Sequence, residues 1–282
     1  MLLIRETFDL IDRALAEDQV AHDVTTDTLI TSGQQGAVVL VARAEGVLAG
    51  LPVAGAVFAR VDPSLRLEAL AEDGSPVSPG QHLARIEGAV AGMLRAERTA
   101  LNFLQRMSGV ATETARYVRA VEGLPARVLD TRKTLPGHRH LDKYAVRMGG
   151  GRNHRHNLSD GILIKDNHIA AARAQGLSLA DTVRNAVERA PMALKVEVEV
   201  ESQEEALEAL DAGAHILLLD NMTPDDMRQI VGMAKGRALT EASGGIDLET
   251  VRAVAETGVD FISSGALTHS TRALDISMEL QA

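Results

Sequence analysis

Residues that bind anions are concentrated in one stretch of this chain, between positions 128 and 170. From Asp130 to Lys165 the stretch contains eight lysines and arginines against three aspartates, although the whole chain carries a formal net charge of −10. A basic segment in an acidic protein favours a pocket for a small, multiply anionic ligand, because a cleft focuses the field of the charges that line it. A solvated basic face is the alternative interpretation.

A short apolar run lies near each end of this segment. Residues 128–129 precede Arg132 and Lys133, and residues 162–164 precede Lys165. Both runs are typical of short buried strands that end in charged groups. Charged residues at the carboxyl ends of buried parallel strands form the active sites of α/β barrels, so the placement of these cations predicts a functional site.

Composition restricts the classes of partner. Aromatic residues make up only 2% of the 282 residues, which argues against single-stranded nucleic-acid binding, and the acidic net charge disfavours nucleic acids and anionic membranes as partners. The absence of cysteine excludes disulfides, thiolate metal sites and a cysteine nucleophile. The first residues contain acids, and no apolar run reaches 18 residues, so we expect a soluble cytoplasmic protein.

The N-terminal part of the chain predicts a β-rich domain. The expected elements are a helix over 2–17, a pair of strands within 35–51, a helix over 52–61, a strand over 65–70 and two helices within 90–121 that are separated near Ser108-Gly109. The spacing from Val77 to Ile86 is similar to a lipoyl or biotinyl carrier repeat. A carrier needs a lysine at a hairpin tip, and the first lysine of this chain is Lys133, so the domain is structural.

From position 127 onward the pattern alternates between strand and helix. The predicted strands are 127–132, 161–165, 195–200, 215–219, 238–242 and 260–264, with helices near 170–189, 202–212, 223–235 and 247–257. Such alternation predicts parallel strands joined by right-handed crossovers. Six strands are fewer than the eight of a closed barrel, so we expect an α/β fold with an open, incomplete barrel. The tail from His269 is expected to return to the small domain.

Every predicted strand delivers polar residues at the same end. Ser243-Gly244 and Ser264-Gly265 follow the last two strands, where barrel loops commonly bind phosphate. Glu199 and Asp220 lie on adjacent strands and could bind sugar hydroxyls, hold Mg²⁺ or stabilise a developing cation. Five cationic groups would neutralise carboxylates or pyrophosphate, and they are Arg132, Lys133, His154, Arg155 and Lys165. The implied ligands are a phosphorylated sugar and a polyanion.

Paired histidines offer a different chemistry. His138 and His140, or His154 and His156, could bind zinc as barrel hydrolases do. In those enzymes the pair stands at the end of a strand. Here the first pair follows Pro136-Gly137 and the second follows a run of three glycines, so zinc is the less favoured interpretation.

Several runs of sequence together resemble the quinolinate phosphoribosyltransferase family, the carboxylating nicotinate-nucleotide pyrophosphorylases. They are AERTALNFLQRMSG, DTRKTLPGHRHLDKYAVRMGGGRNHR, ILIKDNHI, VEVEVES, ILLLDN, EASGGI and GALTHS, in this order and spacing. The resemblance implies an α/β sandwich domain over 1–110, joined by the tail 270–282, and an open α/β barrel over 111–269. It also implies a homodimer, or a higher oligomer of dimers, whose active site joins one subunit's barrel to the partner's small domain.

The resemblance further implies a reaction and the roles of residues. Quinolinate and 5-phosphoribosyl 1-pyrophosphate would react with Mg²⁺, and without an organic cofactor, to give nicotinate mononucleotide, CO₂ and pyrophosphate. The substrate-binding residues would be Arg98, Arg132, Lys133, His154, Arg155, Lys165, Glu199, Asp220, Ser243, Gly244, Gly265 and His269. Lys133, Lys165, Glu199 and Asp220 would be catalytic, and Glu199 and Asp220 would bind the metal. The alternatives are a molybdenum-transport-associated paralogue of the same fold and a non-catalytic phosphosugar sensor.

Overall fold

A computed structural model describes residues 2–281, which form two compact units. Within the described residues, the first unit comprises 2–115, 134–150 and 267–281, and the second comprises 116–133 and 151–266. Both have the mixed α/β character that the sequence predicts, the first with an antiparallel sheet and the second with a parallel one. None of the helices within residues 2–281 combines the length and apolar character that crossing a bilayer requires.

The first unit is built around a four-stranded antiparallel sheet in the order β12-β1-β5-β3. The elements of the sheet are β1 (Gln35–Ala42), β3 (Arg66–Ala69), β5 (His82–Ala89) and β12 (Ile276–Gln281), beside a short pair of β2 (Gly46–Val47) and β4 (Pro76–Val77). The C-terminal strand β12 pairs with β1 from Ala37 to Ala42, so the tail does return to the small domain as predicted.

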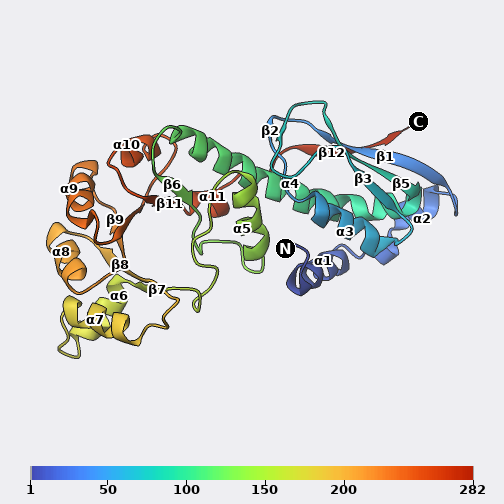
Figure 1. Cartoon of the computed structure of the whole chain (residues 1–282). Coiled ribbons are helices and arrows are strands. Elements are labelled where there is room, and N and C mark those ends of the chain that lie inside the picture. Colours follow the sequence, from blue (N-terminus) through green and yellow to red (C-terminus); the bar gives the residue numbers. More distant parts are fainter. Residues whose placement is uncertain (1, 282) are drawn as a thin grey trace. The chain divides into compact units, whose positions relative to one another are not determined.

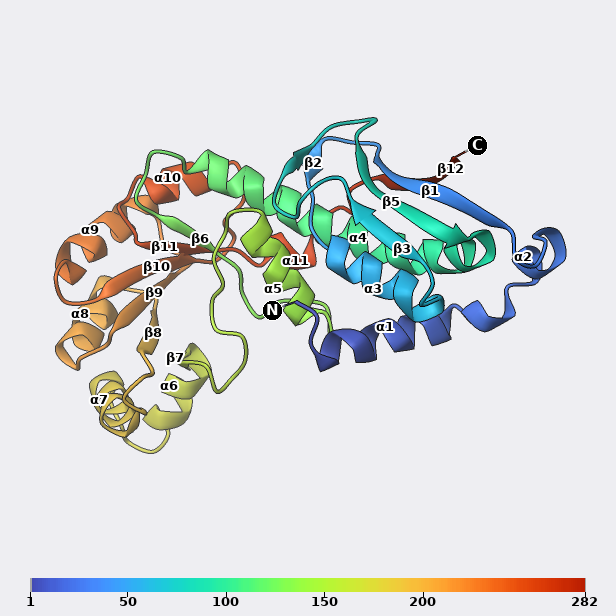
Figure 2. The ribbon, with the colours of Figure 1, turned by 45° about the vertical axis from the view of Figure 1, so that its right-hand side comes forward.

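Helices pack along one face of this sheet (Figure 2). The layer is formed by α3 (Leu51–Val61) and the long α4 (Val90–Ala120), α1 (Arg5–Glu17) packs against α3, and the short α2 (Val24–Leu29) lies beyond the end of the sheet. Val53, Ala54 and Val57 of α3 are buried completely, as their helical spacing requires. Asp12 of α1 accepts a hydrogen bond from Arg60 Nε of α3 at 2.6 Å, which ties the first helix to the layer.

Helix α4 corrects one prediction. The sequence predicted two helices separated near Ser108-Gly109, but α4 is a single helix from Val90 to Ala120. Ser108 Oγ accepts a hydrogen bond from the Ala49 backbone at 3.0 Å. A Cβ added at Gly109 would collide with the carbonyl of Arg272. Ser108 and Gly109 therefore allow the segments around Ala49 and Arg272 to pack closely against α4, and they do not end the helix. Glycine at this position costs about 1 kcal/mol in helix propensity.

Helix α5 (Arg139–Met148) belongs to the first unit by its contacts. Asp142 is buried and pairs with Arg106 of α4 at 3.3 Å, and the Tyr144 hydroxyl donates to Asp73 Oδ2 at 2.8 Å. The units therefore differ from the predicted domain ranges at residues 134–150, which the sequence had placed with the barrel. Polar side chains determine this position, and the local pattern of apolar residues does not reveal their partners.

The second unit is a parallel sheet of six strands in the order β6-β11-β10-β9-β8-β7. Its strands are β6 (Arg127–Leu129), β7 (Ile162–Ile164), β8 (Val196–Val200), β9 (Ile216–Asp220), β10 (Leu239–Ser243) and β11 (Phe261–Ser263). Five of the six lie within one residue of their predicted bounds, and β6 ends three residues before the predicted 132. The first two strands of the unit stand at opposite edges, so the barrel is open between β6 and β7, as expected.

Helices surround the strands of this unit on their outer side (Figure 1). They are α6 (Asp166–Arg173), α7 (Leu179–Arg189), α8 (Gln203–Asp211), α9 (Pro224–Ala234) and α10 (Val251–Ala255), while the short α11 (Ala266–His269) leads back to the first unit. Ser202 and Thr223 cap α8 and α9 by accepting backbone N–H bonds at 3.1 and 3.3 Å. The caps begin each helix directly after the loops that follow β8 and β9.

The free edge of β6 is covered by a single residue. The backbone N–H of Arg152 donates to Val128 at 2.9 Å, and Asp130 donates its N–H to the Arg152 carbonyl at 3.2 Å. Arg152 thus forms an isolated parallel bridge with Leu129. This bridge brings the segment after Gly151 alongside the carboxyl end of β6.

Candidate active site

Ten of the twelve predicted substrate-binding residues lie in the second unit. Lys165 follows β7, Glu199 and Asp220 lie at the ends of β8 and β9, and Ser243 ends β10. Because the strands are parallel, these ends share one edge of the sheet. The other residues of this group are Arg132, Lys133, His154, Arg155, Gly244 and Gly265.

The four predicted catalytic residues share one electrostatic neighbourhood. Lys165 Nζ lies 2.9 Å from Glu199 Oε2, and the Glu199 side chain is only 10% exposed. Burial and the negative charge of Glu199 raise the pKa of Asp220, while Lys165 and Lys133 oppose that shift. Asn221 Nδ2 donates to Asp220 at 2.7 Å. Two carboxylates and two lysines are therefore assembled where β7, β8 and β9 end.

Two arginines form a second centre of charge. Burial and the nearby positive charge of Arg132 lower the pKa of Arg155, and Glu197 acts in the opposite direction. Arg155 Nη1 donates to the Gly161 carbonyl at 3.0 Å, which fixes the side chain. Two neighbouring guanidinium groups repel each other, so a carboxylate or phosphate ligand between them would be stabilised by both.

His154 contacts two acidic side chains and the backbone of the next residue. Its Nε2 lies 3.1 Å from Glu197 Oε2 and 3.5 Å from Glu241 Oε2, and its Nδ1 accepts the backbone N–H of Arg155 at 2.7 Å. Both ring nitrogens are thus directed to protein groups. Direct binding of a substrate by His154 stays a prediction, and the contacts show instead that the ring links Arg155 to two buried carboxylates.

Sequence reasoning did not select three acidic residues that organise this segment. Asp130 is fully buried and accepts hydrogen bonds from Asn153 Nδ2 at 2.6 Å and from the His154 backbone at 2.9 Å. Glu197 and Glu241 both place a carboxylate oxygen close to Nε2 of His154. The alternation in VEVEV places Glu197 on the same face of β8 as Glu199, and that signal could have identified it.

The loops after β9 and β10 are packed together. Gly244 has a φ of 92°, and a Cβ at this position would collide with Asn221. The Asn221 backbone donates to the Ser243 carbonyl at 3.1 Å. Glycine is thus required at 244 both for its left-handed conformation and for this approach. The predicted phosphate residues Ser243 and Gly244 accordingly lie next to Asp220, whereas Gly265 follows β11.

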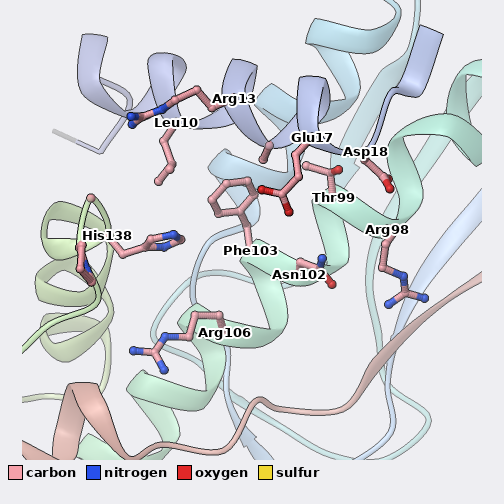
Figure 3. Close-up of a pocket in the computed structure, with 13 residues that line it drawn as sticks. Leu10, Arg13, Glu17, Asp18, Arg98, Thr99, Asn102, Phe103, Arg106 and His138 are labelled. Atoms are coloured by element: carbon pink, nitrogen blue, oxygen red, sulfur yellow. The ribbon is translucent and has the colours of Figure 1, made fainter. Parts of the chain in front are cut away.

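Arg98 and His269 belong to the first unit. Arg98 of α4 is one of the residues that line a cavity of about 620 Å³ between α1, α4 and the turn at Pro136–His138, and its guanidinium group points away from α1 (Figure 3). Arg13 and Arg106 also line the cavity, and they contribute with burial to a lowered pKa of His138. Glu17 and Asp18 line the same cavity, so its wall carries charges of both signs. His269 Nδ1 lies 2.6 Å from Ser270 Oγ.

Neither histidine pair comes together as a set of metal ligands among the residues that the structure describes. His138 stacks on Phe103 with 6.1 Å between ring centroids, whereas His140 Nε2 lies 3.2 Å from the Leu2 carbonyl. The metal-ligating side chains that do converge within residues 2–281 are His154, Glu197 and Glu241, which include one histidine of the second pair and none of the first.

Comparison with known proteins agrees with this architecture over nearly the whole chain. Residues 23–108 match the quinolinate phosphoribosyl transferase N-terminal domain, and residues 110–279 match the C-terminal domain. A probable nicotinate-nucleotide pyrophosphorylase (carboxylating) from Bacillus subtilis is 40% identical over 272 residues, which is 96% of this chain and 92% of that protein. A mitochondrial quinolinate phosphoribosyltransferase (decarboxylating) from Nicotiana tabacum is 41% identical, over 97% of this chain and 83% of its own length.

Solved structures agree with the sequence matches. The nicotinate-nucleotide pyrophosphorylase from Francisella tularensis superposes with a TM-score of 0.93 at 37% identity, and the match covers 99% of this chain and 98% of that one. The enzyme of the same name from Ehrlichia chaffeensis gives a TM-score of 0.91 at 32% identity over the full length of both chains. On these grounds the chain belongs to the quinolinate phosphoribosyltransferase family.

Proposed function

We propose that this protein transfers the phosphoribosyl group of 5-phosphoribosyl 1-pyrophosphate to quinolinate and decarboxylates the product to nicotinate mononucleotide, a step of NAD biosynthesis. The observation that carries the proposal is the Lys165–Glu199 pair beside Asp220, at the carboxyl edge of the open barrel. The family membership supports the same reaction. A molybdenum-transport-associated paralogue and a phosphosugar sensor have no support among the relatives described above, which bear the enzyme's name.

The arrangement explains how the chemistry proceeds. The ring nitrogen of quinolinate attacks C1 of the ribose while pyrophosphate leaves, and positive charge develops on the sugar. Glu199 and Asp220 would stabilise that charge electrostatically, because fixed carboxylates cost no reorganisation when the charge appears. When CO₂ departs, the electron pair of the broken bond stays on ring carbon C2, where the adjacent pyridinium nitrogen stabilises it, and a proton from solvent then replaces the carboxylate. No side chain has to form a covalent bond, so positioning and charge neutralisation supply the rate enhancement.

Cationic side chains would hold the anionic groups of both substrates. Arg132 and Arg155 would receive a carboxylate of quinolinate through their paired guanidinium groups, with Lys133 and Lys165 nearer the leaving pyrophosphate. Ser243, Gly244 and Gly265 would bind the 5′-phosphate through the small residues of their loops. His269 is assigned to the same phosphate through its match to the family sequence.

Magnesium fits the same edge of the sheet. Burial, followed by the negative charge of Glu199, raises the pKa of Asp220, and a hard cation with oxygen ligands would stabilise the charged form of both carboxylates. Glu199 and Asp220 would hold Mg²⁺, which would neutralise charge on the pyrophosphate. Chelation with EDTA should abolish turnover and added Mg²⁺ should restore it. Restoration by Zn²⁺ but not by Mg²⁺ would contradict this assignment.

A homodimer would complete the site. Arg98 lines a cavity of the first unit together with Arg13 and Arg106, while the proposed catalytic groups belong to the second. We assign Arg98 to the active site of the partner subunit, where its charge would bind quinolinate. A cytoplasmic location completes the proposal, consistent with the acidic composition.

The deciding experiment uses the purified protein with both substrates and Mg²⁺. Formation of nicotinate mononucleotide and of CO₂ in equal amounts is expected. Nicotinate is the matched control base, because it lacks the 2-carboxylate that the cationic cluster would bind. Turnover of nicotinate as efficient as that of quinolinate, or no CO₂ from quinolinate, would contradict the proposal.

A further inference from the structure

The inner wall of the second unit contains a buried cluster that the proposed reaction does not use. His154, Glu197 and Glu241 line a cavity of about 390 Å³, together with Leu129, Ile216 and Phe261 from the neighbouring strands. The side chains of Glu197 and Glu241 are only 6% and 3% exposed. Glu197 and Glu241 each lie two residues before a predicted active-site residue, Glu199 and Ser243, which places them about 6–7 Å deeper along the strands.

The hydrogen bonds of His154 determine where its proton lies. Nδ1 accepts the N–H of Arg155 at 2.7 Å, so Nδ1 carries a lone pair and Nε2 carries the hydrogen. Nε2 therefore donates to Glu197 Oε2 at 3.1 Å. A metal ion on Nε2 would require the hydrogen on Nδ1, where it would face the Arg155 N–H. The geometry favours a shared proton over a metal.

The two carboxylates cannot both be charged at low cost. Burial, followed by the negative charge of Glu197, raises the pKa of Glu241 to about 8, against the opposing effects of His154 and Ser263. Oε1 of each carboxylate is buried without a hydrogen-bond partner in the described chain. The other charged residues lining the cavity are Arg152, Arg155, Asp160 and Lys195. Burial and the neighbouring Glu197 therefore favour the protonated form of Glu241 at neutral pH.

We propose that Glu241 and Glu197 are positioning residues for the binding of quinolinate. Glu241 donates to Glu197, Glu197 accepts the Nε2–H of His154, and Nδ1 of His154 holds the backbone of Arg155. Arg155 in turn stays fixed to Gly161 and close to Arg132, where a carboxylate ligand would bind. This inference rests on the proposed function, because quinolinate is the ligand that Arg155 would receive.

The first test separates hydrogen bonding from volume. Glu197→Leu and Glu241→Leu should each raise the KM for quinolinate about tenfold or more, because the chain of hydrogen bonds to Arg155 is broken. Neither should change kcat or the KM for 5-phosphoribosyl 1-pyrophosphate by a comparable factor. Glu197→Gln and Glu241→Gln should recover most of the loss, since an amide can accept or donate in place of the carboxyl. The exposed Glu249→Gln is the matched control.

The second test uses pH. Above about pH 8 the wild type loses the proton of Glu241, so its KM for quinolinate should rise between pH 7 and 9. Glu241→Gln cannot lose that proton and should lack this rise.

The pH dependence of stability tests the same proton without substrate. The folded-state pKa of Glu241 lies above its unfolded value, so the stability of the wild type falls as pH rises through the window up to about 8. The Tm of Glu241→Gln relative to wild type should increase across that window and stay constant above it.

The outcomes are distinct. Leucine and glutamine variants with equal KM values, or an alkaline rise that persists in Glu241→Gln, would overturn the inference even in an active enzyme. Stoichiometric zinc or manganese in the purified protein, lost in both glutamine variants, would replace the shared proton with a metal. The protein could lack transferase activity while its melting temperatures still follow the expected pH dependence. That result would contradict the proposed function but would support the shared proton between Glu241 and Glu197. Leucine variants that do not fold leave the decision to Glu241→Gln.

Discussion

At the scale of single residues, the proposed site uses cations to bind the anionic groups of the substrates and carboxylates to stabilise the positive charge on the sugar. Lys133 and Lys165 act as point charges beside Asp220, whereas Arg132 and Arg155 can bind a planar carboxylate with two hydrogen bonds each. Glu199 has the opposite task, since its charge would matter most when the sugar becomes cationic. Each assignment predicts which kinetic constant a substitution should change.

Removal of either lysine should weaken catalysis without unfolding the protein. Lys133→Ala and Lys165→Ala should each lose about 2 kcal/mol of transition-state stabilisation, a decrease of about 30-fold in kcat/KM. The charge of a leaving pyrophosphate would then lack a partner. Steady-state kinetics with a melting curve for each variant checks this, and the surface substitution Lys235→Ala is the control. Unchanged kcat/KM in both variants would remove the lysines from the site.

Glu199→Gln should lower kcat more than it raises the dissociation constant for quinolinate. The amide keeps the shape of the side chain but loses the charge that the oxocarbenium-like state needs. Single-turnover rates and equilibrium binding of quinolinate measure the two effects separately. A change confined to quinolinate affinity would place Glu199 among the base-binding groups instead.

At the scale of elements, local sequence pattern predicted the barrel strands closely because each is a short apolar run with a polar end. The predicted break in α4 was wrong. Gly109 packs against Arg272, which is 163 positions away in sequence, so the local pattern contains no signal of this contact. For Glu197, the alternation of VEVEV indicates the face of the strand but not the partners of the side chain. Its partner Glu241 is two strands away, and only the order β8-β9-β10 brings them within reach of one histidine.

Two glycines within helices should respond to alanine in opposite directions. Gly109→Ala should destabilise the protein by about 1–3 kcal/mol, because the added methyl group meets the Arg272 carbonyl. Gly232→Ala in α9 should stabilise it by up to about 1 kcal/mol, since nothing lies within 4 Å of the added methyl and alanine favours the helix. Chemical denaturation of both variants gives the comparison. Stabilisation by Gly109→Ala would show that α4 is not held there by close packing.

At the scale of the whole molecule, the proposed site needs two subunits, and two inactive proteins can test that. After subunit exchange between Arg98→Ala and Lys165→Ala, half of the dimers are mixed at a 1:1 ratio. In each mixed dimer one site is fully wild type if Arg98 serves the partner, so about a quarter of wild-type activity should return. If Arg98 served its own subunit, every site would carry a lesion and confirmed exchange would restore nothing.

The return of the last strand to the first sheet has a consequence for biosynthesis. β1 lies between β5 and β12, and its Val38–Ala42 segment is buried in the finished protein. β12 begins 234 positions after Ala42, so at about 5–20 residues per second the ribosome needs roughly 10–50 s to supply it. During that interval an apolar strand edge is open to other nascent chains. Cells that produce this protein rapidly should therefore depend on chaperones that occupy the β1 edge until the final residues emerge.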